Sequence, residues 1–503
     1  MALVILVFSQ LTYAQGVTTS QISGTITDGV GRGIEAATVT ATHIPSGSTY
    51  GAYTGEDGRF SISGMRVGGP YKIVASFLGY STQEFNNVEL RLGENKKLTF
   101  KLAEASTELT AVEVVGKIGS TGENSGTSTQ ITTEKIENMP TINRDLSDFT
   151  RLTPQSANAG GGSSFGGTNN RYNAVYVDGA VNNDVFGLAA SGTNGGQTGI
   201  SPFSLDIIDQ VQVILSPYDV TYGGFAGAGI NAVTRSGTNN IGGTAYYYFQ
   251  NQNMVGKTNK LLSDRLKVDR TKVADFTKST YGVSLSGPIK KDKVFFFVNA
   301  ELQDDQTPSP FEITGYKGNL KSADFEALRQ TLLSKYNYDA GTFSSVEDQL
   351  KGLKLFGKLD FNINSKNKLT LRHSYTNAEN FDRNASSSST INFSNNGIYF
   401  PSVTNSSALE LNTLLGKKYS NNLILGYTKV NDDRDPLGGD FPYVIIRDGA
   451  GTIRFGSEEF STSNLVEQDI ISLTDNFKIY SGKHTFTIGT HNEFFKFRNL
   501  FIN

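Results

Sequence analysis

The chain has 503 residues and a formal net charge of −3, with 54 glycines and neither cysteine nor tryptophan. This length predicts about three domains. The lack of cysteine excludes disulfide frameworks, Cys-ligated metal sites and thiol nucleophiles, and the near-neutral charge argues against nucleic acid as a partner. No apolar run approaches the roughly 20 residues that a helical membrane span needs. A multispan helical membrane protein is therefore excluded, whereas a β-barrel is not.

The first residues predict export. The apolar run Ala2–Phe8 is too short to span a membrane, and Ala14 before Gln15 suits a signal-peptide cleavage site. The basic n-region is missing, because the first basic residue is Arg32, and a misassigned start would account for that. The alternative is a buried N-terminal strand. We interpret residues 1–15 as a signal peptide.

Residues 20–103 predict a small β-sandwich, because short β-type runs recur at regular spacing between turn residues. The segment Gly55–Gly58 is a hairpin signal. The runs are Gln21–Asp28, Thr38–His43, Arg59–Ser63, Tyr71–Phe77 and Lys97–Leu102.

Several motifs in these residues together resemble the carboxypeptidase regulatory-like domain. They are Gly24–Asp28, Ala37–Val39, Thr54–Phe60, Tyr71–Ala75 and Gly79–Tyr80. The resemblance implies a transthyretin-like sandwich that serves as a periplasmic accessory module without peptidase activity. Carbohydrate binding is suggested by the fold alone.

Residues 104–130 are rich in Ser, Thr, Gly and Glu and predict a flexible linker. It contains one β-prone segment: Leu109, Thr110, Ala111, Val112, Glu113, Val114 and Val115. Such a segment on a mobile linker is suited to capture by strand addition to a partner's sheet. The alternatives are a last strand of the sandwich or a first strand of the next domain.

The following stretch crowds Gly, Asn and Ser around a few apolar β runs, which predicts a domain that needs to be enclosed. It resembles the plug domain of TonB-dependent outer-membrane receptors at Val177–Gly179, Ile208–Ile214, Tyr222–Gly224 and Gly229–Arg235. Within that superfamily, Asn169–Asn173, Asp178–Gly187 and Gly224–Asn239 resemble the Oar-like subgroup. The resemblance implies an α+β plug over residues 131–238. It also implies that Leu109–Val115 is a TonB box.

From residue 239 onward, strands of about ten residues alternate between apolar and polar positions, which is the period-two pattern of β-strands. Between Lys293 and Gln303, for example, Val294, Phe296 and Val298 form an apolar row opposite Asn299 and Glu301. The polar rows of the next two strands include Lys354, Lys358, Asp360 and Arg372.

The connections between these strands alternate in length. Short turns near 290–292, 364–367, 417–421 and 481–483 separate connections of dozens of residues. This asymmetry is typical of outer-membrane barrels and not of soluble sandwiches. The charges Asp432–Asp435 are interpreted as loop solvation. About nine strands are present where plugged transporters have about 22, so we expect residues 239–503 to be the N-terminal part of a longer barrel.

No catalytic, cofactor or metal site is predicted. Gly162–Gly166 matches a nucleophile-elbow pattern but lacks the required strand and helix around it. The four histidines lack zinc-ligand spacing. Asp178, Asn182, Asn183 and Asp184 would suit calcium, although turn capping is the better interpretation.

The predicted fold is mainly β: a small transthyretin-like β-sandwich, an α+β plug domain and the first strands of a large antiparallel transmembrane β-barrel. The predicted function, from the resemblance, is TonB-dependent uptake of a large substrate, with peptide or protein favoured over siderophore or glycan. The predicted location is the cell outer membrane, with the N-terminal domain in the periplasm.

The predicted partners are TonB with its inner-membrane energising complex, an extracellular ligand and outer-membrane lipid. The ligand is expected near the Gly160–Gly167 tract and four plug residues: Tyr172, Asn182, Asn183 and Phe186. The alternatives are a surface adhesion protein and a secreted carbohydrate-binding protein, neither of which transports anything.

Overall fold

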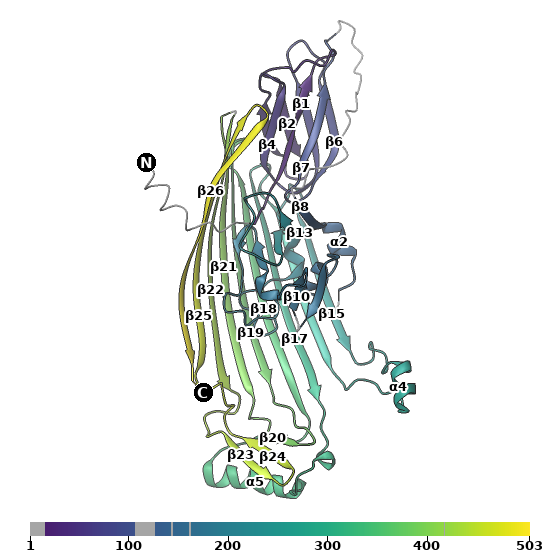
Figure 1. Cartoon of the computed structure of the whole chain (residues 1–503), viewed down its shortest axis with the longest axis vertical. Coiled ribbons are helices and arrows are strands. Elements are labelled where there is room, and N and C mark those ends of the chain that lie inside the picture. The colour runs from purple at the N-terminus through teal and green to yellow at the C-terminus, as the bar shows by residue number, and fades with distance from the viewer. Residues whose placement is uncertain (1–15, 106–125, 142–143, 160–161, 417, 503) are drawn as a thin grey trace.

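The computed structural model describes residues 16–105, 126–141, 144–159, 162–416 and 418–502. The predicted signal peptide therefore lies outside the described residues. Figure 1 shows three parts: a small β-sandwich at one end, a long curved sheet, and a third unit against the inner side of that sheet. We call the long sheet the wall and the unit inside it, from β8 to β14, the plug.

The sandwich is formed by two sheets that enclose one core. Their strands are β4 (Arg59–Met65), β1 (Ser20–Thr27) and β7 (Asn95–Lys101) in the first sheet, and β3 (Ser48–Tyr53), β2 (Thr38–His43), β5 (Gly68–Ser76) and β6 (Gln83–Leu90) in the second. Alternate residues point inward, so Ile22 and Ile26 of β1 are fully buried against the second sheet's Val39 and Ile73. The predicted sandwich is confirmed.

The hairpin prediction at Gly55–Gly58 is wrong in one respect. The tight turn forms, with the Gly58 amide donating to the Gly55 carbonyl at 2.9 Å. The strands on either side of it, however, belong to different sheets, because β3 pairs with β2 while β4 pairs with β1. Phe60 and Ile62 of β4 are buried in the core that the two sheets share. Their burial favours passage of the chain from one sheet to the other over a local hairpin.

The plug is a five-stranded sheet covered by short helices and turns. Its elements are β8 (Gly126–Ile131), α2 (Thr133–Asn138), α3 (Ser147–Thr150), β9 (Ser156–Ala159), β10 (Gly162–Phe165), η2 (Asn170–Tyr172), β11 (Ala174–Val177), β12 (Ala180–Val181), η3 (Leu205–Ile207), β13 (Ile208–Pro217) and β14 (Gly229–Thr234). The strand order is β12-β11-β14-β13-β8, so the predicted α+β class is confirmed. Most of β8 lies within residues 104–130, which the sequence predicts to be a linker. The linker prediction missed this strand because its partner β13 is remote in sequence.

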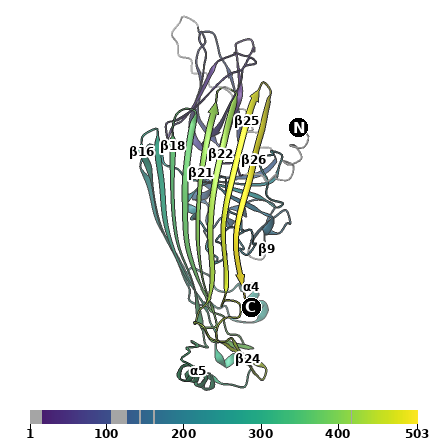
Figure 2. The ribbon, with the colours of Figure 1, turned by 90° about the vertical axis from the view of Figure 1, so that its left-hand side faces the viewer.

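The wall is a nine-stranded antiparallel sheet in which each strand pairs with the next wall strand along the chain. The strands are β15 (Gly242–Asn251), β16 (Thr277–Lys290), β17 (Val294–Ser309), β18 (Val346–Asn362), β19 (Asn367–Asp382), β21 (Ile398–Leu415), β22 (Tyr419–Pro436), β25 (Asn464–Ser481) and β26 (His484–Phe501). Figure 2 shows this sheet from the side as a long, curved surface.

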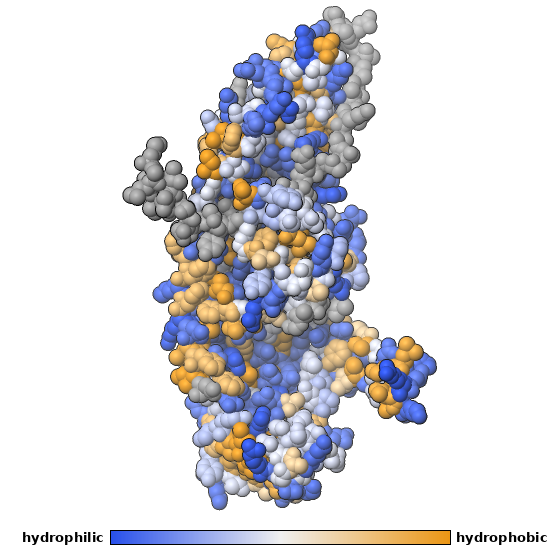
Figure 3. Space-filling view, in the orientation of Figure 1, coloured by the Kyte–Doolittle hydropathy of each residue, from blue (hydrophilic) through white to orange (hydrophobic). Residues whose placement is uncertain are grey.

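The burial of the wall is inverted relative to a soluble protein. Leu302 and Leu355, on the outer row, are 54% and 42% exposed, whereas Glu301, Lys354 and Arg372, on the inner row, are 4–5% exposed. Figure 3 shows hydrophobic residues along the flank of the wall and hydrophilic residues in the hollow below the plug. Apolar outside and polar inside is the arrangement of a membrane barrel, which confirms the predicted class.

The two ends of the wall differ. One end has short turns, and the other carries long connections that contain α4 (Lys260–Leu266), η4 (Ile313–Gly315), α5 (Ser322–Tyr336), β20 (Thr390–Asn392), β23 (Val444–Asp448) and β24 (Gly451–Phe455). The segments around α5, β20, β23 and β24 share a core that includes Phe325, Phe393 and Ile453, and we call this unit the outer cap (Figure 1). No helix in the described part of the chain is long and apolar enough to cross a membrane.

The interpretation of Asp432–Asp435 as loop residues is wrong. β22 continues to Pro436, which places these charges in a wall strand. Asp432 is only 5% exposed and accepts a hydrogen bond from the Ser402 hydroxyl at 2.5 Å. Pairing with β21 and β25 extends the strand beyond the apolar pattern that marks its membrane part.

Candidate functional site at the contact between plug and wall

A tight turn of the plug brings one carboxylate to the wall. β11 and β12 form a hairpin in which Val177 pairs with Ala180, so the turn consists of Asp178 and Gly179. Both turn residues have positive φ, 46° and 73°, as a type I′ turn requires and as Asp-Gly sequences favour. A Cβ at Gly179 would lie 2.5 Å from the Ile424 side chain of the wall, so only glycine allows this close approach.

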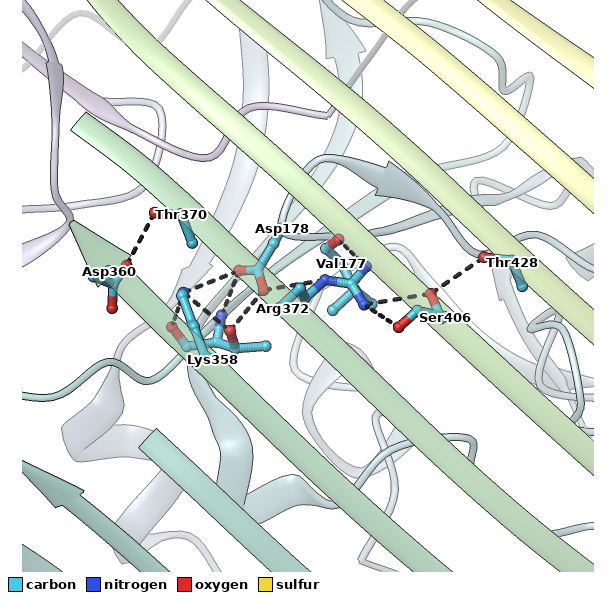
Figure 4. A network of polar contacts seen from close by, with 9 residues as sticks. Val177, Asp178, Lys358, Asp360, Thr370, Arg372, Ser406 and Thr428 are labelled. Atoms are coloured by element: carbon cyan, nitrogen blue, oxygen red, sulfur yellow. Dashed lines mark hydrogen bonds and ion pairs between the residues drawn. The ribbon is translucent and has the colours of Figure 1, made fainter. Parts of the chain in front are cut away.

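The Asp178 carboxylate meets two cations of the wall (Figure 4). Lys358 Nζ lies 3.5 Å from its Oδ1, and Arg372 Nε lies 3.3 Å from its Oδ2. The Thr234 amide and hydroxyl donate to the same carboxylate at 2.9 and 2.6 Å. Arg372 also donates to the Val177 carbonyl at 2.8 Å. The cluster therefore joins two plug strands to two wall strands.

The register of the wall explains why an anion is needed here. Lys358 and Arg372 are directly opposite each other on β18 and β19, and like charges in that position are destabilising. Both side chains and Asp178 are buried. Although burial acts to raise the pKa of Asp178, the charges of Lys358 and Arg372 and the Thr234 hydrogen bonds hold that pKa below its ordinary value. Asp178 is therefore ionised at neutral pH.

A second buried ion pair touches the plug farther along the wall. Glu301 and Lys354 are cross-strand partners whose Oε1 and Nζ lie 2.8 Å apart. The other carboxylate oxygen accepts hydrogen bonds from the Ser204 hydroxyl of the plug at 2.6 Å and from the Tyr246 hydroxyl at 2.5 Å. Burying such groups is costly unless they are fully paired, so the plug completes a site that the wall alone leaves short of partners.

The inner row of β19 shows which part of the plug faces which end of the wall. Near the short turns, Lys368 Nζ lies 5.1 Å from the Tyr50 ring of the sandwich. Arg372 meets Asp178, and beyond it Thr376 donates to Pro202 at 2.7 Å and Asn380 to Thr198 at 3.4 Å, both on carbonyl oxygens. The plug loop that contains Pro202 and Thr198 therefore lies toward the long-connection end.

The four predicted ligand-facing residues occupy different environments. Tyr172 is 59% exposed, whereas Asn182 is only 4% exposed. Asn183 accepts the Val175 amide at 2.6 Å, and Phe186 packs edge-on against Phe497 of the wall with ring centroids 5.0 Å apart. The structure thus groups Asn182, Asn183 and Phe186 in one loop, with only Tyr172 fully open.

The other predicted segments are described in part or not at all. The candidate TonB box Leu109–Val115 lies outside the described residues. In the Gly160–Gly167 tract, Gly162–Phe165 form β10, which pairs with β9. Asp184 accepts the amides of Phe186 and Ala189, consistent with turn capping. Within the described ranges, no group of three or more His, Asp or Glu side chains is arranged to hold a metal ion.

Comparison with known families assigns each of the three parts. Residues 21–103 match the carboxypeptidase regulatory-like domain, residues 120–230 the TonB-dependent receptor plug domain, and residues 233–352 an outer membrane beta barrel domain. The chain has the three-part organisation of a TonB-dependent receptor. The matched barrel domain is an outer-membrane domain, and the TonB-dependent transporters as a family are not enzymes.

Individual relatives of the receptor are longer than this chain. The TonB-dependent transporter Oar of Myxococcus xanthus is 31% identical over 155 residues, which are 31% of this chain and 14% of that protein. The outer membrane transporter YddB from Escherichia coli is 15% identical, with a TM-score of 0.49 over 73% of this chain and 48% of its own. The siderophore receptor PirA from Acinetobacter baumannii is also 15% identical, with a TM-score of 0.48 over 72% of this chain and 47% of its own. The chain thus spans about half the length of these solved structures.

In the sequence, the wall residues of this site stand in polar rows, and no local pattern predicts a role for them. The feature that could have predicted the site is the pairing of Lys358 with Arg372. Two cations opposite each other on an inward row repel each other, so a nearby anion is expected. That signal depends on strand register, which a single sequence determines only when both turn positions are known.

Proposed function

We propose that this receptor takes up a large substrate across the outer membrane, with TonB supplying the force that displaces the plug. The observation that carries the proposal is the plug held inside a membrane-type wall by the buried ion pairs of Asp178 with Lys358 and Arg372 and by the hydrogen bond from Ser204 to the buried Glu301. Such contacts retain the plug firmly, yet they break completely when the plug moves as a unit. Short turns face the periplasm in outer-membrane barrels and long loops face outward, which supports a periplasmic sandwich.

The ligand would enter from the long-connection end. The outer cap lies at that end (Figure 1), and Phe186 of the plug packs against Phe497 in the half of β26 nearer to it, with Tyr172 open to solvent. Peptides or proteins are the favoured substrates because of the resemblance to the Oar-like subgroup. The relative named above is itself a TonB-dependent transporter.

The proposed division of the chain follows the sequence analysis. Residues 1–15 are the signal peptide, 20–103 the sandwich, 104–130 the linker with the TonB box, 131–238 the plug, and 239–503 the first part of the barrel. TonB would add a strand to Leu109–Val115, because this segment is β-prone and lies in the linker between the sandwich and the plug.

The test is TonB binding by the full-length receptor in detergent. Val112→Pro removes an amide hydrogen and fixes φ, so we expect about tenfold weaker binding of the purified periplasmic domain of TonB, because strand addition depends on main-chain hydrogen bonds. Ser120→Pro, in the same linker but outside the segment, is the matched control and should bind normally. Equal binding by the Val112→Pro variant and the parent would reject the TonB box and favour the adhesion alternative.

A further inference from the structure

The sandwich packs against the wall and the plug at the short-turn end, and we call this position seated (Figure 1). On the wall, Asn362 Nδ2 donates to the Ser48 hydroxyl at 2.8 Å, and the Ser63 and Ser420 hydroxyls are 3.0 Å apart. The Asn239 amide, just before β15, donates to the Pro45 carbonyl at 2.8 Å. These contacts come from the residues just before the first wall strand and from two turns of the wall, so the sandwich spans its rim.

The sandwich also contacts the plug itself. The Leu92 amide donates to Gln210 Oε1 at 3.0 Å, and Gln130 Nε2 donates to the Leu92 carbonyl at 2.9 Å. Val67 and Leu92 of the sandwich bury Val233 of β14 in a small apolar cluster. The loop between β6 and β7 therefore rests on plug strands β8, β13 and β14, and β14 pairs with β11 of the Asp178 hairpin.

The residues before β1 reach deeper than the sandwich does. We call Gly16–Thr19 the strap. The Thr18 hydroxyl donates to the buried carboxylate of Glu410 on β21 at 2.5 Å. A Cβ at Gly179 would lie 2.9 Å from Thr18 Cγ2, and one at Gly16 would lie 2.6 Å from the Tyr176 Cβ. The strap is thus held between the wall and the hairpin that carries Asp178.

The chemistry of this contact allows it to separate. Most of its partners are Ser, Asn, Gln and backbone groups, and its apolar cluster has three residues, whereas the sandwich keeps a complete core of its own. A polar cavity lined by Lys358, Asp360 and Lys368 lies where sandwich, plug and wall meet. Polar contacts of this kind are typical of transient interfaces. Separation exposes little apolar area to water, so its free-energy cost is small.

We infer that the sandwich and its strap form a removable stopper that locks the plug from the periplasmic side. The strap continues directly into β1, so any movement of the sandwich away from the rim draws Thr18 from Glu410 and frees the hairpin. Conversely, the plug is retained while the sandwich is seated. This inference rests on the proposed function only in that the plug must be displaced during uptake.

The test introduces pairs of cysteines, a residue that the 503 residues of this chain lack. In the full-length receptor, Ser63→Cys with Ser420→Cys replaces two hydroxyls that touch across the contact, and oxidation should join sandwich to wall. The receptor is placed in a planar bilayer, and the potassium current is recorded as urea loosens the plug. At a urea concentration that opens the reduced form, we expect the oxidised form to carry about tenfold less current, and reduction should restore it.

A matched control stiffens the sandwich without tethering it. Ser23 and Asn95 lie on neighbouring strands within the sandwich, with their side chains 2.9 Å apart, so Ser23→Cys with Asn95→Cys should leave opening by urea unchanged. If the disulfide between positions 63 and 420 does not form, or if the oxidised receptor opens like the reduced one, the inference is wrong.

The strap is tested by two threonine variants. Thr18→Val keeps the shape but removes the hydrogen bond to Glu410, and we expect channels to open about tenfold more often at a fixed urea concentration, because a buried carboxyl group loses one of its hydrogen-bond partners. Thr19→Val, the same change on a half-buried neighbour, should match the parent; equal behaviour of the two variants would overturn the role of the strap. The current requires neither TonB nor ligand, so this result is independent of the TonB-binding test.

Discussion

Lys358 and Arg372 lie directly opposite each other on two wall strands, and the carboxylate of Asp178 from the plug lies within 3.5 Å of both. Without the plug, these two cations would face each other in the lumen and lose the carboxylate that both of them contact. The wall therefore has a charge arrangement that is satisfied only when the plug is seated. This relationship explains how a domain rich in glycine and asparagine is held in one position.

Neutralising the central anion should loosen the plug. Asp178→Asn keeps the shape and leaves both wall cations buried and unpaired, so we expect a loss of about 3–5 kcal/mol in plug stability. The measurement is hydrogen exchange of peptides covering residues 174–181 in the full-length receptor. Adding Lys358→Met should recover part of this loss, because it removes the surplus charge.

An exposed ion pair provides the contrast for that experiment. Lys260 and Asp264 on α4 are both more than half exposed, at 2.7 Å, and exposed pairs contribute about 0–1 kcal/mol. Asp264→Asn should therefore leave plug exchange unchanged. Equal exchange in Asp178→Asn and Asp264→Asn would show that the buried cluster does not retain the plug.

The second ion pair predicts a non-additive result. Glu301→Gln leaves Lys354 buried without its carboxylate and should release the plug more readily, whereas Glu301→Gln with Lys354→Met should be closer to the parent, since both charges are gone. The measurement is hydrogen exchange of peptides that contain Ser204, which donates to Glu301. Additive losses in the double variant would contradict this interpretation.

The sandwich should weaken in acid because of one histidine. Burial, with a smaller effect from Arg66, lowers the pKa of His43 from 6.5 to about 3. The folded sandwich thus keeps His43 neutral while the unfolded chain binds a proton below pH 6.5, so stability is complete above pH 6.5 and falls as the pH drops toward 3. At pH 5 the loss is roughly 2 kcal/mol.

This acid sensitivity is linked to the contact between sandwich and wall. His43 Nδ1 lies 2.7 Å from the Ser46 hydroxyl, which lies 2.8 Å from that of Ser48, the acceptor for Asn362. Hydrogen exchange of β2 peptides at pH 7.5 and pH 5, corrected for intrinsic rates, measures the effect. His43→Gln should lose this pH dependence; a variant that keeps it would assign the effect to another group.

The outer cap should behave as a folded unit and not as loose loops. Phe325 of α5 is fully buried in its core, so Phe325→Ala should cost about 3–5 kcal/mol and open the cap to trypsin added to intact cells. Leu333→Ala, on the same helix but 41% exposed, is the matched control. Equal resistance of both variants to trypsin would mean that this core does not hold the cap.

Local patterns in the sequence determined the class of each part. The alternation between Lys293 and Gln303 and the contrast between short turns and long connections indicated the wall, because strand period and turn length are local properties. Regular short strands likewise indicated the sandwich. The pattern did not show that β3 and β4 enter different sheets or that β22 extends through Asp432, because both depend on pairing with remote strands.

Only the tertiary structure decided which charges meet. Asp178, Lys358 and Arg372 come from three segments that are far apart in the chain, and Thr18 reaches Glu410 only because the sandwich is seated on the rim. A single sequence records which residues are polar, but the distance between two of them depends on strand register and domain packing. The sequence thus determined the three parts and their order, and the packing of plug and sandwich against the wall decided how they are held together.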